Sequence, residues 1–481
     1  MALRALSSLL AVAALAVLAG LGIAGDSRAE TRPAFMAQAC PEALKDTGRT
    51  VACGFVMVPQ DRAAPAGLWV RLPVVVVKAA TPVKGAVPVV YLHGGPGGGV
   101  VSGVAETLTA EVGLELVGRD QDWIFFDQRG AESARPTLDC GDLALNDAGP
   151  SGPTVVQALT ACARRLEREG VDFRRYTSKD IVADLRDIRT ALGLGEVELY
   201  GLSYGTRVAM SALVHDPEGI RAVILDSPWP PEARWTDTAP VWVSREVRRV
   251  LARCAADADC SARRPDGAAK LERLASRLAA GPLIEGGRAY RAEMLALFLM
   301  DALYDPDGVR SLPASIDRFA SNDLSELDRY AEGSDAGYAE AMHMAVLCNE
   351  EFVFESRQAV VDAARGDPIA EAVASTVVNY FDACGAFGPG APDPVEQQPV
   401  RSGVPTLFLA AGIDAGCPAE LSEQAVKGFA NGKLVVVANA THGVSAHSPC
   451  GRRVARAFLL APGAPLIGDC VEEGALGLEF K

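Results

Sequence analysis

Continuous runs of apolar residues recur along the chain and predict strands that are buried on both faces. Each run is bounded by Gly, Pro or Asp, and helical patterns fill the intervals between the runs. Continuous rather than alternating hydrophobicity is typical of a parallel sheet that helices cover on both sides. The runs occur in the segments WVRLPVVVVKA, VPVVYLHGG, DWIFFDQRG, VELYGLSYG, IRAVILDSP, VPTLFLAAG and KLVVVANATHG. The pattern therefore predicts an α/β fold with a mostly parallel central sheet.

One helix between these strands can be predicted in detail. Ser178 is a suitable N-cap, because its hydroxyl can accept a hydrogen bond from the first turn of the helix. Gly193 and Gly195 would end the helix. Its apolar residues fall on one face, as an amphipathic helix requires; they are Ile181, Leu185, Ile188 and Leu192.

The strand pattern disappears between about Trp229 and Pro399, where charged helical patterns replace it. A polar, helix-rich insertion before the last strands predicts a cap over the edge of the sheet. We therefore expect a core in two parts, residues 30–230 and 401–481, that is interrupted by a helical cap of residues 231–400.

The start of the chain indicates export. MALR carries one positive charge, and no charge occurs from Ala5 to Gly25. Ser27 and Ala29 then place small residues two apart, which is the layout of a secretory signal peptide, residues 1–29, with cleavage after Ala29. The alternative is an uncleaved anchor, because the uncharged run is long enough to span a bilayer. We expect a secreted or periplasmic protein without stable membrane association after cleavage.

The 11 cysteines agree with export, because disulfides persist in oxidising compartments. The sequence does not fix their connectivity, so pairing of sequence neighbours is a hypothesis that leaves Cys417 single. The hypothetical pairs are Cys40 with Cys53, Cys140 with Cys162, Cys254 with Cys260, Cys348 with Cys384, and Cys450 with Cys470.

Charge and spacing exclude two other classes of function. The formal net charge of -15 leaves no sustained basic face for nucleic acid, whose binding depends on clustered Lys and Arg. The sequence contains no C-x-x-C and no H-x-x-x-H, so we expect no metal site. We also expect no cofactor.

A glycine-rich loop and a serine motif indicate hydrolysis instead. The segment YLHGGPGGGV has neither the lysine nor the glycine spacing of phosphate-binding loops. A strand that ends in His-Gly-Gly-Pro is typical of a loop that offers a backbone N–H to a reacting carbonyl. Gly201–Gly205 reads G-x-S-x-G between a strand and a helix, which predicts Ser203 as an exposed nucleophile on a strained turn. The N–H groups of Tyr204 and of Gly95, or alternatively Gly94, would form the oxyanion hole.

The nucleophile needs a base, and the base needs a carboxylate that fixes its tautomer. His442 follows the last apolar strand, where the carboxyl edge of a sheet would bring an imidazole to the nucleophile, and His447 is the alternative. Asp414 ends the preceding strand and gives the chain order Ser, Asp, His of this fold, with Asp226 as the competing acid.

Taken together, HGGPGGG, DQRG, GLSYGTR, the strand-end aspartate and THG resemble the proline iminopeptidase and tripeptidyl aminopeptidase family of α/β-hydrolases. The resemblance extends from about Cys40 to Cys470, with a C-terminal region like that of the tripeptidyl aminopeptidases. It implies an exported serine exopeptidase that acts on peptides with free N-termini. It also implies acids that pair with the substrate ammonium. The segment LCNEEF supplies two of them, Glu350 at the family's C-x-[DE] spacing and Glu351 beside it. The alternative is that both acids belong to a solvated helix end.

Two departures from the family pattern stand out. The residues after Asp414 read Ala-Gly-Cys-Pro instead of a Pro-x-Thr-Pro-like turn, so Cys417 replaces a residue expected to hydrogen-bond near the acid. GAESARP also stands where GTGxSxP is common. Because the fold does not fix the leaving group, an esterase or small-amide hydrolase remains an alternative, as does an inactive binding protein.

Overall fold

The structure is a computed structural model. It describes residues 33–141, 154–330, 338–466, 470 and 478–481. The predicted signal peptide, residues 1–29, lies outside the described residues. Within the described ranges, no helix combines the length and the apolar character that a membrane span needs.

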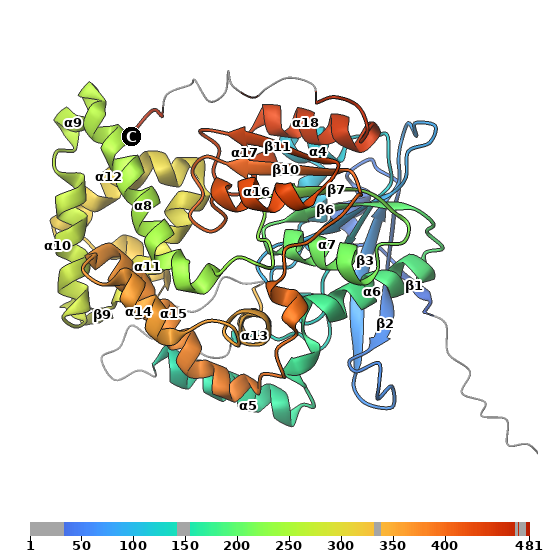
Figure 1. The fold of residues 1–481 in the computed structure, drawn as a ribbon, viewed down its shortest axis with the longest axis horizontal. Coiled ribbons are helices and arrows are strands. Elements are labelled where there is room, and N and C mark those ends of the chain that lie inside the picture. Colours follow the sequence, from blue (N-terminus) through green and yellow to red (C-terminus); the bar gives the residue numbers. More distant parts are fainter. Residues whose placement is uncertain (1–32, 142–153, 331–337, 467–469, 471–477) are drawn as a thin grey trace, which may run out of the picture.

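A nine-stranded sheet forms the centre of the molecule, in the order β1-β2-β3-β5-β4-β6-β7-β10-β11 (Figure 1). Strands β1, β2, β3 and β5 pair antiparallel in succession, and every pairing from β5 to β11 is parallel. The α/β class with a mostly parallel sheet is thus confirmed. The strands are β1 (Phe35–Gln38), β2 (Val51–Pro59), β3 (Trp69–Val77), β4 (Val89–Leu92), β5 (Trp123–Phe126), β6 (Val197–Leu202), β7 (Ile220–Asp226), β10 (Thr406–Ala411) and β11 (Gly432–Val437).

Helices cover both faces of the sheet, which explains the continuous apolar runs. Side chains alternate between the faces of a strand. Accordingly, Val223 and Leu225 of β7 lie in one hydrophobic cluster and Ile224 between them lies in another. Helices α6 (Ser178–Ala191) and α7 (Tyr204–His215) pack on one face, and α4 (Glu111–Val117) and α18 (Pro449–Leu460) pack on the other.

Helix α6 confirms the predicted amphipathic helix with one correction. The N-cap is Thr177, whose side chain accepts the N–H of Asp180, and not Ser178. Ser178 is instead buried, and its hydroxyl donates to Glu350 at 2.8 Å. The helix ends as predicted, because Gly193 adopts a positive φ of 64°.

Between β7 and β10 the chain forms a helical insertion (residues 235–397) that lies beside the sheet in Figure 1. We propose this part of the chain as the cap that we predicted for residues 231–400. It also contains a short hairpin of β8 (Leu283–Glu285) and β9 (Arg288–Tyr290), which the sequence analysis did not predict. Its α-helices are α8 (Trp235–Ala256), α9 (Ala258–Arg263), α10 (Gly267–Ala279), α11 (Ala292–Tyr304), α12 (Pro306–Ala320), α13 (Glu340–Val346), α14 (Arg357–Ala364) and α15 (Pro368–Ala383).

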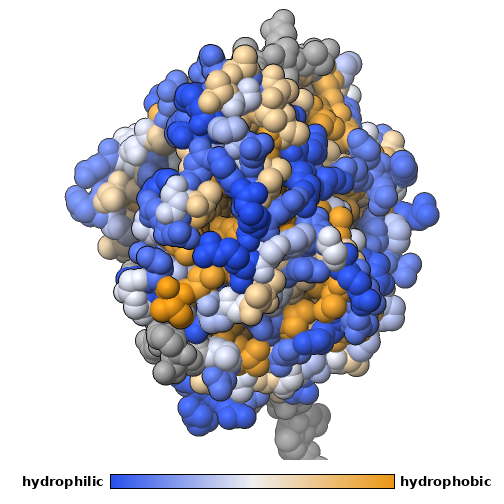
Figure 2. Space-filling model, turned by 90° about the vertical axis from the view of Figure 1, so that its left-hand side faces the viewer, coloured by the Kyte–Doolittle hydropathy of each residue, from blue (hydrophilic) through white to orange (hydrophobic). Residues whose placement is uncertain are grey.

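The helical insertion contributes most of a second hydrophobic cluster, which includes Leu251, Leu274, Leu299 and Leu312; Ile413 and Ala415, which follow β10, also belong to it. Its outer face, seen in Figure 2, is mostly hydrophilic and carries separate apolar patches. The apolar residues of α10 and α12 therefore face inward, which supports the helices as one packed layer.

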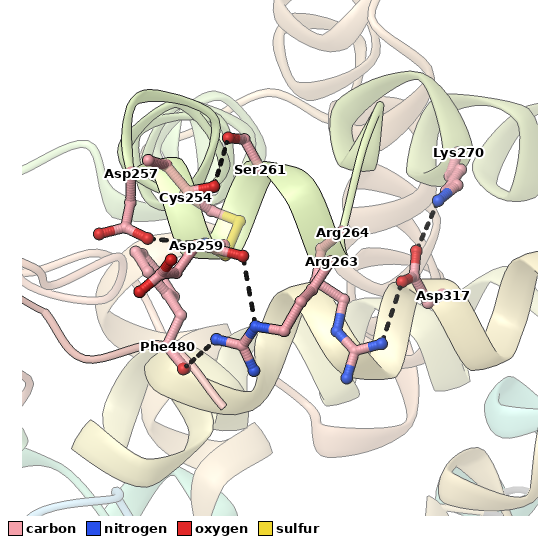
Figure 3. The surroundings of a disulfide bond; sticks show 11 residues. Cys254, Asp257, Asp259, Ser261, Arg263, Arg264, Lys270, Asp317 and Phe480 are labelled. Carbon is pink, nitrogen blue, oxygen red and sulfur yellow. Dashed lines mark hydrogen bonds and ion pairs between the residues drawn. A yellow bond between two sulfur atoms is a disulfide. The ribbon is translucent and has the colours of Figure 1, made fainter.

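Five disulfides join the cysteines as sequence neighbours, so the hypothetical pairing is confirmed. Figure 3 shows one of them, Cys254–Cys260, which links the end of α8 to α9. Beside it, the guanidinium of Arg263 donates to the carbonyl of Phe480 at 3.0 Å and so holds the C-terminal residues against the insertion. Cys417 is buried and unpaired.

Candidate active site

The candidate nucleophile lies on a sharp turn between β6 and α7. Ser203 has φ 55° and ψ -123°, a left-handed conformation that is strained for a residue with a side chain. The flanking glycines allow the close approach of strand and helix: a Cβ at Gly201 would lie 2.5 Å from the carbonyl oxygen of Gly205, and one at Gly205 would lie 2.0 Å from that of Leu92. This is the geometry expected of a nucleophile elbow.

The glycine loop after β4 lies directly against this turn. A Cβ at Gly94 would come 2.9 Å from Cβ of Ser203. In the part of the chain that the structure describes, no acceptor binds the backbone N–H of Gly95 or of Tyr204. Both N–H groups are thus free of acceptors among the described residues, as an oxyanion hole requires.

The DQRG segment holds the glycine loop in place. One carboxylate oxygen of Asp127 accepts the N–H groups of Val100 and Val101 at 2.7 and 2.9 Å. The side-chain amide of Gln128 donates to the carbonyl of His93 at 2.9 Å. Both ends of the loop are therefore fixed by hydrogen bonds from a neighbouring strand end, which preorganises the backbone beside Ser203.

The candidate base and acid form a direct pair. Nδ1 of His442 lies 2.8 Å from Oδ2 of Asp414, and the other carboxylate oxygen accepts the N–H groups of Gly416 and Cys417 at 3.0 and 2.8 Å. Burial opposes the imidazolium form of His442, but the negative charge and hydrogen bond of Asp414 outweigh it, so the pKa of His442 is raised. Because Nδ1–H donates to the carboxylate, Nε2 is the nitrogen that remains to accept a proton.

The two alternatives from the sequence lie elsewhere. Asp226 does not bond the imidazole of His442; its carboxylate accepts hydrogen bonds from the Tyr200 hydroxyl at 2.8 Å and the N–H of Ser445 at 3.0 Å. It thereby anchors the turn that carries His442. His447 lies at the end of the short helix α17 (Val444–His447) and makes no contact with Asp414 in the described structure.

Cys417, the unusual residue of the acid turn, lies beside the nucleophile. Burial raises the pKa of its thiol well above the ordinary value, Asp414 adds to the rise, and the side chain of Ser203 opposes it. The thiol is therefore protonated at neutral pH.

A cavity of about 540 Å³ joins these groups. Ser203, His442 and the loop residues Gly94 and Gly95 line one side of it. The helical insertion supplies the other wall, which is mainly aromatic and aliphatic with a few polar groups. Three of the wall residues carry carboxylates: Glu293, Asp301 and Glu340.

Glu350 and Glu351, the acids predicted to bind the substrate ammonium, do not line this cavity. They lie on a π-helical turn, η3 (Leu347–Glu351), and both are buried against Arg207 of α7. Oε2 of Glu350 lies 3.0 Å from Nε of Arg207, and Oε1 of Glu351 lies 2.5 Å from Nη1. The structure thus places both carboxylates in an ion-pair cluster that connects the helical insertion to the helix behind the nucleophile.

A family model described as alpha/beta hydrolase fold matches residues 87–446. The chain belongs to the α/β-hydrolase family. Three relatives have peptidase names. Serine protease Hip1 of Mycobacterium tuberculosis is 31% identical to this chain over 198 residues. Tripeptidyl aminopeptidase of Streptomyces coelicolor is 28% identical over 191 residues, and proline iminopeptidase of Heyndrickxia coagulans is 28% identical over 167 residues. These matches cover 38%, 37% and 34% of this chain and 36%, 35% and 41% of the relatives, so they span well under half of each relative.

Arg207 was not among the residues predicted for the site of this α/β-hydrolase. The residue is fully buried and also lies 3.4 Å from the Glu396 carboxylate. A signal was present, because Arg207 is the one Arg, Lys, Asp or Glu in the helix that follows GLSYG, and a buried charge requires partners. Its partners could not be identified, since Glu350 is 143 residues away along the chain.

Proposed function

We propose that this α/β-hydrolase is an exported serine exopeptidase that releases amino acids or short peptides from free N-termini. The observation that carries the proposal is that His442, held by Asp414 at 2.8 Å, lines the same cavity as the strained Ser203. The peptidase names of the three relatives support the class of substrate. Five disulfides support export, because such bonds persist in oxidising compartments.

In the proposed mechanism, Ser203 attacks the scissile carbonyl while Nε2 of His442 takes the hydroxyl proton. The N–H groups of Gly95 and Tyr204 donate to the oxyanion of the tetrahedral intermediate, and each such donor contributes roughly 3 kcal/mol in comparable enzymes. His442 then gives the proton to the leaving amine. In the second half of the cycle His442 takes a proton from a water molecule, which attacks the acyl-enzyme. His442 then returns the proton to the oxygen of Ser203 and frees the serine, so the cycle needs no metal or cofactor.

The cavity supports a short N-terminal segment as the occupant. Its volume of about 540 Å³ lies within the range of small-molecule pockets, roughly 300–1,000 Å³. A folded chain cannot enter a pocket of this size, but the first residues of a peptide can. This limit favours release from the end of a chain over cleavage within it.

Selection for a free N-terminus is assigned to Glu293 and Glu340, two of the three carboxylates of the cavity wall, in place of Glu350 and Glu351, because the third, Asp301, already pairs with Arg329. A carboxylate in a partly dry pocket binds an ammonium through charge-assisted hydrogen bonds. Asn379 donates to Glu293 at 2.8 Å, and the N–H of Cys140 donates to Glu340 at 2.9 Å, so both acids are oriented. Among the other wall residues, His343 does not oppose a cation, because burial lowers its pKa to about 4 and leaves it neutral.

A panel of fluorogenic amides with free and blocked N-termini tests this function. We expect cleavage of the free amides only, with product masses that give the number of residues released. Equal cleavage of free and blocked amides would remove the exopeptidase assignment and favour a general amide or ester hydrolase. Fluorophosphonate labelling that Ser203→Ala abolishes is expected in either case, and a wild-type protein that does not label would indicate a binding protein.

A further inference from the structure

Tyr304, at the end of α11, lies flat on the imidazole of His442. The ring centroids are 4.1 Å apart and the planes differ by 12°. Tyr304 belongs to the helical insertion, whereas His442 follows β11 of the sheet. The insertion therefore contributes a side chain that touches the candidate base itself and not only the substrate cavity.

The unusual turn after Asp414 makes room for this ring. A Cβ at Gly416 would lie 2.1 Å from the Tyr304 hydroxyl oxygen and 2.9 Å from the ring carbon that bears it, so only glycine leaves the ring where it is. A second aromatic residue of the insertion holds the same turn, since the indole N–H of Trp235 donates to the Gly416 carbonyl at 2.6 Å. Gly416, the second residue of the Ala-Gly-Cys-Pro turn that departs from the family pattern, is thus required by the position of the Tyr304 ring.

We propose that Tyr304 is a positioning residue of the reaction, which holds the imidazole of His442 by stacking and stabilises the imidazolium that forms when Ser203 gives up its proton. Gly416 is the residue that admits it. The negative face of an aromatic ring attracts a cation within about 6 Å by roughly 0.5–2 kcal/mol. The proposal rests on the proposed role of His442 as the base, and it goes beyond that role because it gives the insertion a part in the chemical step.

Several charged or titratable groups face His442, and the stack acts in addition to them. Asp414 and, more weakly, Asp226 favour the imidazolium. The thiol of Cys417, in the acid turn, is neutral. Burial lowers the pKa of His447, and the positive charge of a protonated His442 adds to the decrease. Since Tyr304 favours the charged imidazole, its removal should lower the pKa of His442, whereas loss of Asp414 would lower it through a different contact.

The decisive experiment is an NMR titration of His442 in protein labelled in its five histidines, with the signal assigned by a His442→Gln variant. Tyr304→Leu keeps an apolar side chain over the imidazole but removes the ring. We expect the pKa of His442 to fall by roughly half a unit to one and a half units. Tyr304→Phe retains the ring and should keep the wild-type value.

A second pair of variants moves the same ring without replacing it. Gly416→Ala should lower the pKa of His442 as Tyr304→Leu does, and the same change in the Tyr304→Leu background should add little, because the ring that it displaces is gone. Gly403→Ala is the matched control, since a Cβ there meets nothing within 4 Å.

Kinetics then connect the stack to the reaction. In Tyr304→Leu we expect kcat to fall by roughly 3- to 30-fold and the inflection in its pH profile to move with the NMR pKa. An unchanged pKa of His442 in Tyr304→Leu, with only a lower melting temperature, would overturn the proposal and leave Tyr304 a packing residue. Failure of the proposed function would give a different result, because the wild-type protein would then not label with a fluorophosphonate. The NMR titration would still decide whether Tyr304 affects the pKa of His442.

Discussion

Asp414→Asn changes a single atom beside the imidazole of His442 and is expected to remove most of the activity. In the folded protein one carboxylate oxygen faces Nδ1 at 2.8 Å, and the other accepts the N–H groups of Gly416 and Cys417. The asparagine carbonyl would keep the two backbone bonds, so the amide NH₂ would face Nδ1. Nδ1 must then accept, the ring proton moves to Nε2, and His442 can no longer take the proton of Ser203.

The magnitude follows from the tautomer. In a serine-protease triad the wrong tautomer costs roughly 10⁴-fold in kcat, or about 5.5 kcal/mol of activation free energy. The substituted atom lies behind the imidazole and away from the cavity wall that carries Glu293, so KM should change much less than kcat. The assay is steady-state hydrolysis of an unblocked aminoacyl amide, together with the rate of fluorophosphonate labelling, and both should fall in parallel.

Asp226→Asn is the matched control, because Asp226 is also a buried aspartate and ends a parallel strand at this edge of the sheet. Its carboxylate binds Tyr200 and Ser445 and not His442. The variant should lower stability, with a smaller loss of activity per folded molecule than Asp414→Asn. If Asp414→Asn kept more than about a tenth of kcat, or if Asp226→Asn were the more damaging of the two per folded molecule, the reasoning about the acid would be refuted.

Three further predictions concern the surroundings of the triad. Arg207→Met should lower the free energy of unfolding by about 3–5 kcal/mol at pH 8, because Glu350 and Glu351 lose their buried cation. Burial raises the pKa of these carboxyls to about 8 and about 7, so their contribution to stability falls as pH rises from 5 to 8, and urea titrations should show a smaller effect of the variant at pH 5. Glu293→Gln should raise KM for free aminoacyl amides roughly 10- to 100-fold in steady-state assays, without affecting esters that lack an ammonium. Gly94→Ala would put a Cβ 2.9 Å from that of Ser203 and should slow fluorophosphonate labelling at least roughly 100-fold per folded molecule.

The strands and the chain order of the candidate triad could be predicted from the sequence for a simple reason. Parallel strands of one sheet end at the same edge, so the residues that follow β6, β10 and β11 were expected at that edge whatever the length of the loops. The glycines of the elbow were equally informative, since the backbone approaches at Gly201 and Gly205 leave no space for a side chain.

Side-chain direction within the insertion could not be predicted. The C-x-[DE] spacing predicted Glu350 as an acid that binds the substrate ammonium, but Glu350 lies on a π-helical turn and pairs with Arg207, outside the cavity lining. Strands β8 and β9 have only three residues each, too few for a pattern to emerge. For the N-cap of α6, adjacent hydroxyls at Thr177 and Ser178 satisfy the same sequence rule, and only the buried acceptor Glu350 separates them.

The helical insertion is bound to every part of the candidate machinery, which argues against a freely swinging lid. Tyr304 stacks on His442, the N–H of Ala339 donates to Gly97 of the glycine loop at 3.0 Å, and Glu350 pairs with Arg207 behind the nucleophile. The last contact is fully buried, and separating a buried ion pair from its partner is costly. Substrate access must therefore use smaller movements of the cavity wall, and substitutions within the insertion should change kcat as well as KM. If the insertion only admitted substrate, weakening its contacts with the central sheet would leave kcat for small amides unchanged.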